Sequence, residues 1–232
     1  MPVKNEWAVL SGFSGPVAET VSKRRWCFLT EFRMRTLSIS GLLALSLLAA
    51  LVCTLGDAIH VLTSTLSYPD PLWMGQASWV FPLFFMAFLA MALGGWLLIQ
   101  SLPDAIVGEY GRQGGSWRGL MDQLLLFLLI YLLSGFGNHS PDLLLTIFSV
   151  TFFVRLALAQ NRIFVLLLAL LLAPGGMVAE GFLHEFGMVS YREPEWFNVP
   201  LWLGGLYAHG AFALRDGIRL LVFRPAPAET LV

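Results

Sequence analysis

Six long apolar runs constrain the fold of this chain more than any other feature. The runs extend over residues 37–66, 80–101, 117–136, 141–160, 163–184 and 199–223. Most are close to the roughly 20 residues that an α-helix needs to cross the hydrocarbon core of a bilayer. Since 57% of the residues are hydrophobic and only 12% are charged, a soluble domain of this length would lack polar surface. The sequence therefore predicts an all-α polytopic membrane protein, a bundle of six transmembrane helices.

The basic residues predict how these helices are oriented. Lysine and arginine collect on the cytoplasmic side of membrane proteins. All of them except Arg192 fall in segments that six spans would place on one side. We therefore expect both termini to be cytoplasmic, with residues 1–36 forming a tail that ends in a basic membrane-surface segment. Residues 37–223 would form the transmembrane domain and residues 224–232 a short cytoplasmic tail.

Charge and cysteine content exclude several classes of function. The net charge is −1 and no dense basic face exists, whereas nucleic-acid binding needs clustered lysine and arginine. Cys27 and Cys53 lie far apart and form no Cys-x-x-Cys pair, so neither a disulfide framework nor a zinc finger is indicated. No cofactor is predicted. Within the fifth run, Pro174 should break the helix near its middle and leave room inside the bundle.

Ionisable residues at membrane depth are few, and each is a candidate for function because burying it in lipid is costly. Asp57 and His60 are three residues apart near the non-cytoplasmic end of the first run. Glu180 and His184 are four apart near the same side in the fifth run, and His209 lies in the sixth. Such spacings put each pair on one helix face. We expect all five side chains to face one pocket.

Two interpretations of this pocket stay open. Histidine with carboxylates could bind a metal or transfer protons, but these spacings arise easily by chance and no His-Glu-x-x-His motif is present. Hydrogen-bonded lining is the alternative, and no metal site is predicted. The lipid-contacting residues would be Asp57, His60, Gln76, Trp79, Glu180, His184, Trp202 and His209. In an enzyme, the catalytic residues would be Glu180, Asp57, His60 and His184.

Several segments resemble the Insig family of six-span sterol-sensing membrane proteins. Residues 78–82 are similar to the family's Ala-Trp-Trp-Val-Pro-Pro signature, and residues 68–71 look like the aromatic-Pro-Pro turn before it. Residues 137–140, Gly-Asn-His-Ser, resemble its Gly-Ile-Asn-His-Ala-Ser segment. The likeness continues from Pro194, with Val199, Trp202, Leu203, Gly210 and Arg219 where the family has the same residue types.

This resemblance implies a six-helix bundle around a central cavity that holds a sterol or a diacylglycerol. It also implies a regulatory role through membrane helices of other proteins. However, the family's acidic turn after the fourth span is here Leu158 to Arg162, without an acid, which weakens the expectation of sterol-sensing partners. The membrane would be the endoplasmic reticulum in a eukaryote and the plasma or an internal membrane in a prokaryote.

Two classes of function therefore compete. The leading hypothesis is a non-enzymatic, Insig-like protein that binds a lipid. The alternative is an intramembrane isoprenoid or sterol isomerase or cyclase, in which Glu180 or Asp57 protonates a double bond and an aromatic ring, Trp79 or Trp202, stabilises the carbocation. A transporter is the least favoured class because the sequence shows no inverted repeat and no paired broken helices.

Overall fold

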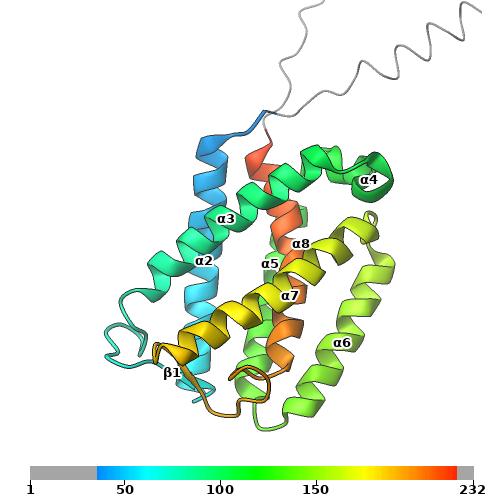
Figure 1. Cartoon of the computed structure of the whole chain (residues 1–232). Coiled ribbons are helices and arrows are strands. Elements are labelled where there is room, and N and C mark those ends of the chain that lie inside the picture. Colours follow the sequence, from blue (N-terminus) through cyan, green and yellow to red (C-terminus); the bar gives the residue numbers. More distant parts are fainter. Residues whose placement is uncertain (1–35, 224–232) are drawn as a thin grey trace, which may run out of the picture. The chain divides into compact units, whose positions relative to one another are not determined.

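The computed structural model describes residues 36–223, so nearly all of the two predicted tails lies outside the described residues. Seven α-helices account for most of this part of the chain (Figure 1). They are α2 (Ile39–Leu62), α3 (Val80–Ser101), α4 (Asp104–Arg112), α5 (Trp117–Phe136), α6 (Pro141–Leu158), α7 (Arg162–Glu185) and α8 (Trp202–Gly217). A π-helical segment, η1 (Ile218–Val222), follows α8 directly, and two short strands are β1 (Leu66–Ser67) and β2 (Ser190–Tyr191).

Five of the described helices are long and apolar enough to cross a membrane: α2, α3, α5, α6 and α7. The sixth predicted span is α8, which has 16 residues, continued by the five residues of η1. Ile218, at the junction, has helical backbone angles of −60° and −47°, so the two segments form one continuous helical stretch. The prediction of an all-α polytopic membrane protein is confirmed.

Helix ends follow local sequence signals. The hydroxyl of Ser38 accepts a hydrogen bond from the Gly41 amide at the start of α2, and Ser116 does the same for Gly119 in α5. Pro141 occupies the first turn of α6, where its missing N–H has no helical partner to lose. Such signals explain why the predicted bounds of α3 and α5 are those found. The short helix α4 was not predicted.

The expected break at Pro174 is wrong, because α7 is one helix of 24 residues that runs through this proline. A proline in a helix leaves one backbone carbonyl without its usual partner. Opening the helix in hydrocarbon would leave several more groups unpaired, with no water to bind them. Continuing the helix is therefore the less costly solution.

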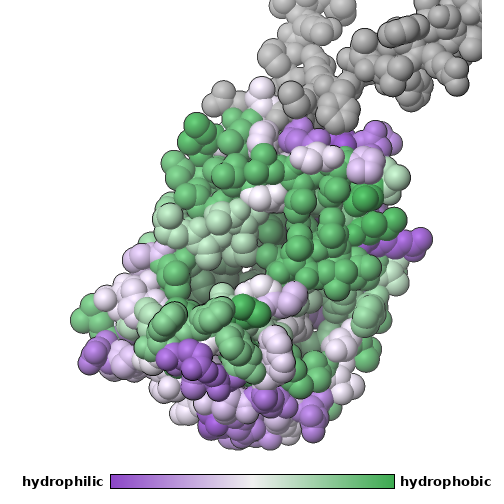
Figure 2. Space-filling view, in the orientation of Figure 1, coloured by the Kyte–Doolittle hydropathy of each residue, from purple (hydrophilic) through white to green (hydrophobic). Residues whose placement is uncertain are grey.

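The centre of the bundle is α8, which packs along α7 and contacts α5 and α6, while α2 packs mainly along α3 (Figure 1). Nearly every residue from Ala211 to Ile218 is buried. At one end of the bundle, the amide of Ser38 donates to the Val222 carbonyl at 2.9 Å. The first and sixth helices thus have their terminal ends together, as an even number of crossings requires. Apolar side chains cover much of the outer surface (Figure 2).

The loops at the opposite end carry a repeat that sequence inspection missed. After α2 and after α7 the chain reads Ser-Tyr, then an acid and a proline, then a tryptophan. Each copy next forms a turn in which two successive residues have positive φ, at Met74 (53°) and Gly75 (74°) and at Phe197 (50°) and Asn198 (63°). The two copies pair as β1 and β2, antiparallel, with Ser67 opposite Ser190.

This repeat extends into the helices. Asp57 precedes the first Ser-Tyr by the same number of residues as Glu180 precedes the second, and Trp79 and Trp202 follow at equivalent positions. The units α2–β1–α3 and α7–β2–α8 are therefore two copies of one pattern that cross the bundle in the same sense. Only an inverted repeat had been considered, which is why the direct one was overlooked.

Candidate functional site

A cavity of about 460 Å³ lies between α2, α3, α5, α7 and α8. Its wall consists mostly of leucine, phenylalanine, alanine and glycine side chains. The polar exceptions are Cys53, Tyr131, Glu180 and Tyr207. Figure 2 shows the apolar surface hollowed between α3 and α7. A cavity of this size and lining has the properties of a site for an apolar ligand.

Helix packing explains the hollow. On one side of the opening, α3 packs chiefly on α2, and on the other, α7 packs chiefly on α8. The part of α7 that faces the cavity carries small residues, Gly175, Gly176 and Ala179, and Ala87 lies on α3. Side chains of this size cannot fill the gap between the two helices, so space for a ligand remains.

Glu180 supplies the one carboxyl group on the cavity wall. Its Oε1 accepts a hydrogen bond from the Tyr207 hydroxyl at 2.9 Å. Tyr191, in β2, lies close to it: burial raises the pKa of the Tyr191 phenol well above its usual range, and the charge of Glu180 raises it further. Glu180 therefore forms the polar end of an otherwise greasy chamber, with phenol groups around it.

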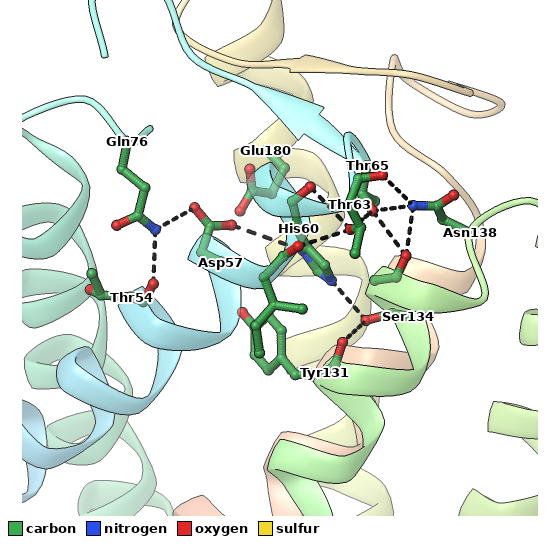
Figure 3. A network of polar contacts seen from close by, with 12 residues as sticks. Thr54, Asp57, His60, Thr63, Thr65, Gln76, Tyr131, Ser134, Asn138 and Glu180 are labelled. Atoms are coloured by element: carbon green, nitrogen blue, oxygen red, sulfur yellow. Dashed lines mark hydrogen bonds and ion pairs between the residues drawn. The ribbon is translucent and has the colours of Figure 1, made fainter. Parts of the chain in front are cut away.

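Asp57, the repeat counterpart of Glu180, lies behind this wall and is 5% exposed. It accepts hydrogen bonds from the Tyr68 hydroxyl and, at 3.1 Å, from Gln76 Nε2 (Figure 3). The same Gln76 amide group donates to the Thr54 carbonyl at 2.8 Å. Burial raises the pKa of Tyr68 far above its ordinary value, and the neighbouring Asp57 adds to the shift. The loop after α2 is thus tied to the helix by a buried carboxyl group.

His60 continues this network towards α5 (Figure 3). Its Nε2 lies 2.8 Å from the Ser134 hydroxyl, which donates its only proton to the Tyr131 carbonyl at 2.9 Å. Nε2 must therefore carry the proton that joins His60 to Ser134. The other ring nitrogen is 4.0 Å from Asp57, which is too long for a hydrogen bond. His60 acts as a buried link between α2 and α5.

The segment after α5 completes the polar layer. Asn138 donates to the Thr65 hydroxyl and, at 2.7 Å, to the Gly135 carbonyl. Its own carbonyl oxygen accepts from Arg192, the basic residue that the charge pattern places on the non-cytoplasmic side. The arginine backbone amide also donates to the Thr65 carbonyl at 3.0 Å. These bonds hold the two repeat loops and the α5–α6 connection together.

The structure separates residues that we expected in one pocket. Glu180 lines the cavity, whereas Asp57, His60 and Gln76 form the network behind it. Trp202 is buried and lies edge-on to His60 at 5.7 Å, and Trp79 packs against Tyr68 at 5.5 Å. His184 is in the last turn of α7 and does not line the cavity. His209 is on another side of α8, bonded to Arg155.

Sequence reasoning missed the tyrosines. Tyr68, Tyr131 and Tyr207 carry most of the hydroxyl groups at the polar end, yet a tyrosine in an apolar run gives no signal by itself. A usable signal existed: Asp57 and Tyr68 are 11 residues apart, and Glu180 and Tyr191 have the same spacing. Within residues 36–223, no group of three or more histidine, cysteine or acidic side chains could hold a metal ion.

Comparison with known proteins gives a result at the level of structure. No family model matches the chain, and no curated protein matches it in sequence. The crystal structure of a mycobacterial Insig homolog, MvINS from Mycobacterium vanbaalenii, matches with a TM-score of 0.64 and 22% identity, over 80% of this chain and 95% of that one. A cross-linked trimeric form of MvINS matches with a TM-score of 0.62 and 23% identity, over 78% of this chain and 94% of that one. This integral membrane protein therefore has an Insig-like fold.

Proposed function

We propose that the protein binds a lipid in the cavity between α3 and α7. The observation that carries this proposal is the combination of an apolar chamber of about 460 Å³, a surface hollow on the lipid-facing side, and one acid at the chamber's end. A hydrocarbon tail can occupy the apolar part without losing contact with other hydrocarbon. A polar headgroup would reach Glu180 and Tyr207.

The polar end favours a neutral ligand with a hydroxyl group. A hydroxyl can donate to the Glu180 carboxyl group and accept from a phenol such as Tyr131 or Tyr207. A phosphate would meet an acid there and find no cation, since no lysine or arginine lines the cavity. Sterols and diacylglycerols are hydroxylated lipids of this kind. The expected role of Asp57, His60 and Gln76 is to hold the wall rather than to touch the ligand.

Membrane helices of other proteins are a second class of partner in this proposal. The outer surfaces of α5 and α6 expose large apolar side chains, among them Leu129 (58% exposed) and Phe153 (63%). Such surfaces suit lipid tails or another transmembrane helix. A regulatory role would follow if ligand binding changed which of these two occupies the surface.

An isomerase or cyclase is the second candidate function. An acid at the end of an apolar chamber could protonate a double bond, and Phe84, Phe88 and Phe127 line the same chamber. Their ring faces could stabilise a carbocation. Trp79 and Trp202, which we expected in this role, are not on the cavity wall.

The test is native mass spectrometry of the full chain released from detergent, with a mixture of cholesterol, diacylglycerol and phosphatidylcholine as the probe. We expect the wild-type protein to retain a hydroxylated neutral lipid. Glu180→Gln should reduce retention roughly tenfold, as expected when a hydrogen bond to a charged group is lost. Gly175→Leu, which adds bulk to the wall, should abolish it, and Glu185→Gln, exposed on the same helix, is the matched control.

A folded wild-type protein that retains no lipid would overturn the binding proposal. Turnover of an isoprenoid substrate that Glu180→Gln abolishes would instead support the enzyme. Retention that is equal in Glu180→Gln and Glu185→Gln would remove Glu180 from the ligand site.

A further inference from the structure

Arg155, near the end of α6, points its guanidinium group into the bundle and away from the cavity. Its two terminal nitrogens donate to Nδ1 of His209 at 2.6 Å and to Oε1 of Gln123 at 2.6 Å. The group also lies 4.1 Å from the centre of the Phe212 ring. Side chains from α5, α6 and α8 thus fix the position of one cation.

All of these partners are neutral. Because Nδ1 of His209 accepts from Arg155, the ring proton is on Nε2, which lies 3.2 Å from the Phe148 carbonyl. An imidazole with one proton carries no charge. Within residues 36–223, no carboxylate lies within 4.0 Å of Arg155. The side chain therefore brings a full positive charge to membrane depth without a counter-ion from the described part of the protein.

A second cluster shows what a paired site in this protein looks like. Arg215 and Arg219 both donate to Asp216 at 2.9 Å, and all three side chains are buried. The two arginines share one acid, and Arg219 also lies 3.7 Å from the Tyr110 ring. Arg155 has comparable neutral contacts but lacks the acid.

Arg155 lies where a lipid phosphate is the nearest anion. It precedes the last residue of α6, Leu158, by three positions, or about 5 Å at the helical rise. The neighbouring Phe153 (63% exposed), Val154 (55%) and Leu158 (81%) expose apolar surface to the bilayer. The guanidinium therefore sits just inside the hydrocarbon boundary, on the side that the charge pattern predicts to be cytoplasmic. Long basic side chains reach headgroups from this depth.

We propose that Arg155, held by Gln123 and His209, binds the phosphate group of a phospholipid between α5 and α6. A guanidinium has five N–H donors, and the two bonds above leave three of them for phosphate oxygens. The neutral partners hold the fork in place without neutralising its charge. None of these residues lines the cavity, so this phospholipid site is separate from the neutral-lipid site proposed above.

The experiment is lipid titration of the detergent-purified full chain, followed by native mass spectrometry, with phosphatidylglycerol and diacylglycerol as probes. We expect one phosphatidylglycerol to stay bound to the wild-type protein. Arg155→Gln should weaken this binding at least about tenfold and leave the binding of diacylglycerol unchanged. Arg155→Lys keeps the charge and should retain part of the affinity. Arg118→Gln removes an exposed arginine from α5 and is the matched control.

Two outcomes would overturn the proposal. One is equal phosphatidylglycerol binding by Arg155→Gln and Arg118→Gln. The other is displacement of the lipid by millimolar inorganic phosphate, which would show a site for free phosphate. Thermal stabilisation of the wild-type protein by phosphatidylglycerol, but not by diacylglycerol at cavity-saturating concentration, keeps the test valid if Arg155→Gln fails to fold.

Discussion

Ser67 lies opposite Ser190 in the two-stranded sheet, and the two serines occupy equivalent positions in the two repeat units. A pair of this kind relates β1 and β2 by a local two-fold axis. In the same relation α2 corresponds to α7 and α3 to α8, and the pairs α2–α3 and α7–α8 are both closely packed. The hollow between α3 and α7 then has a counterpart between α2 and α8. There α5 packs against both helices and fills the space.

The orientation of the bundle can be checked by cysteine labelling. Asp70 is exposed in the loop before α3, and Gln160 is exposed in the turn between α6 and α7, at the other end of the bundle. With Cys27 and Cys53 replaced, we expect Asp70→Cys to react with an impermeant maleimide from the non-cytoplasmic side only. Gln160→Cys should react from the cytoplasmic side only. Labelling of both from one side would contradict the six-crossing arrangement.

Gly181 is needed where α7 meets the turn before α8. A methyl group there would lie 2.0 Å from Cδ1 of Phe197 and 2.5 Å from its carbonyl oxygen. Gly181→Ala should therefore destabilise the protein by ~1–3 kcal/mol through overpacking. Gly175, on the same helix, has nothing within 4 Å of such a methyl group, so Gly175→Ala should not destabilise it. Thermal unfolding in one detergent compares the two, and equal melting temperatures would be evidence against this close approach.

Asp216 holds two buried guanidinium groups in place. Asp216→Asn leaves both without a carboxylate, and breaking a buried pair in this way typically costs ~3–5 kcal/mol. The ion pair of Asp104 with Arg112 provides the comparison, because the Asp104 side chain is 78% exposed. Its change to Asn should have little effect. Denaturant titration that ranks the two variants in the opposite order would show that the buried cluster contributes little to stability.

Ser134 connects α5 to His60. Removing its hydroxyl leaves the Nε2 proton of His60 buried without an acceptor, which should cost ~1–3 kcal/mol. Ser149 on α6 is half-buried and gives a control of the same residue type. We expect Ser134→Ala, but not Ser149→Ala, to lower the unfolding temperature in detergent. No difference between these variants would mean that the His60 link is dispensable.

Hydropathy was enough to predict where most helices lie. Polar residues in short connections, such as Ser116 and Ser140, mark helix ends clearly, and bounds such as 80–101 follow from them. The direction in which each side chain faces was less accessible. A helix that is apolar all round shows no pattern that separates its lipid side from its packed side.

His209 illustrates this limit. Its position in an apolar run suggested the same pocket as Glu180, but it lies on another side of α8 and bonds to Arg155. Gln123 and Arg155 could have been paired with it only by knowing how α5, α6 and α8 pack. The repeat, by contrast, was present in the sequence, and the equal spacing of Asp57–Tyr68 and Glu180–Tyr191 would have revealed it.

The two helices on either side of the hollow are each supported from behind, α3 by α2 and α7 by α8. Their separation is therefore set partly by the molecules that press against them from the membrane. Lateral pressure in the surrounding leaflet would narrow or widen this gap without any change in the supporting helices. Occupancy of the chamber should then depend on the acyl-chain composition of the host membrane as well as on the concentration of the ligand.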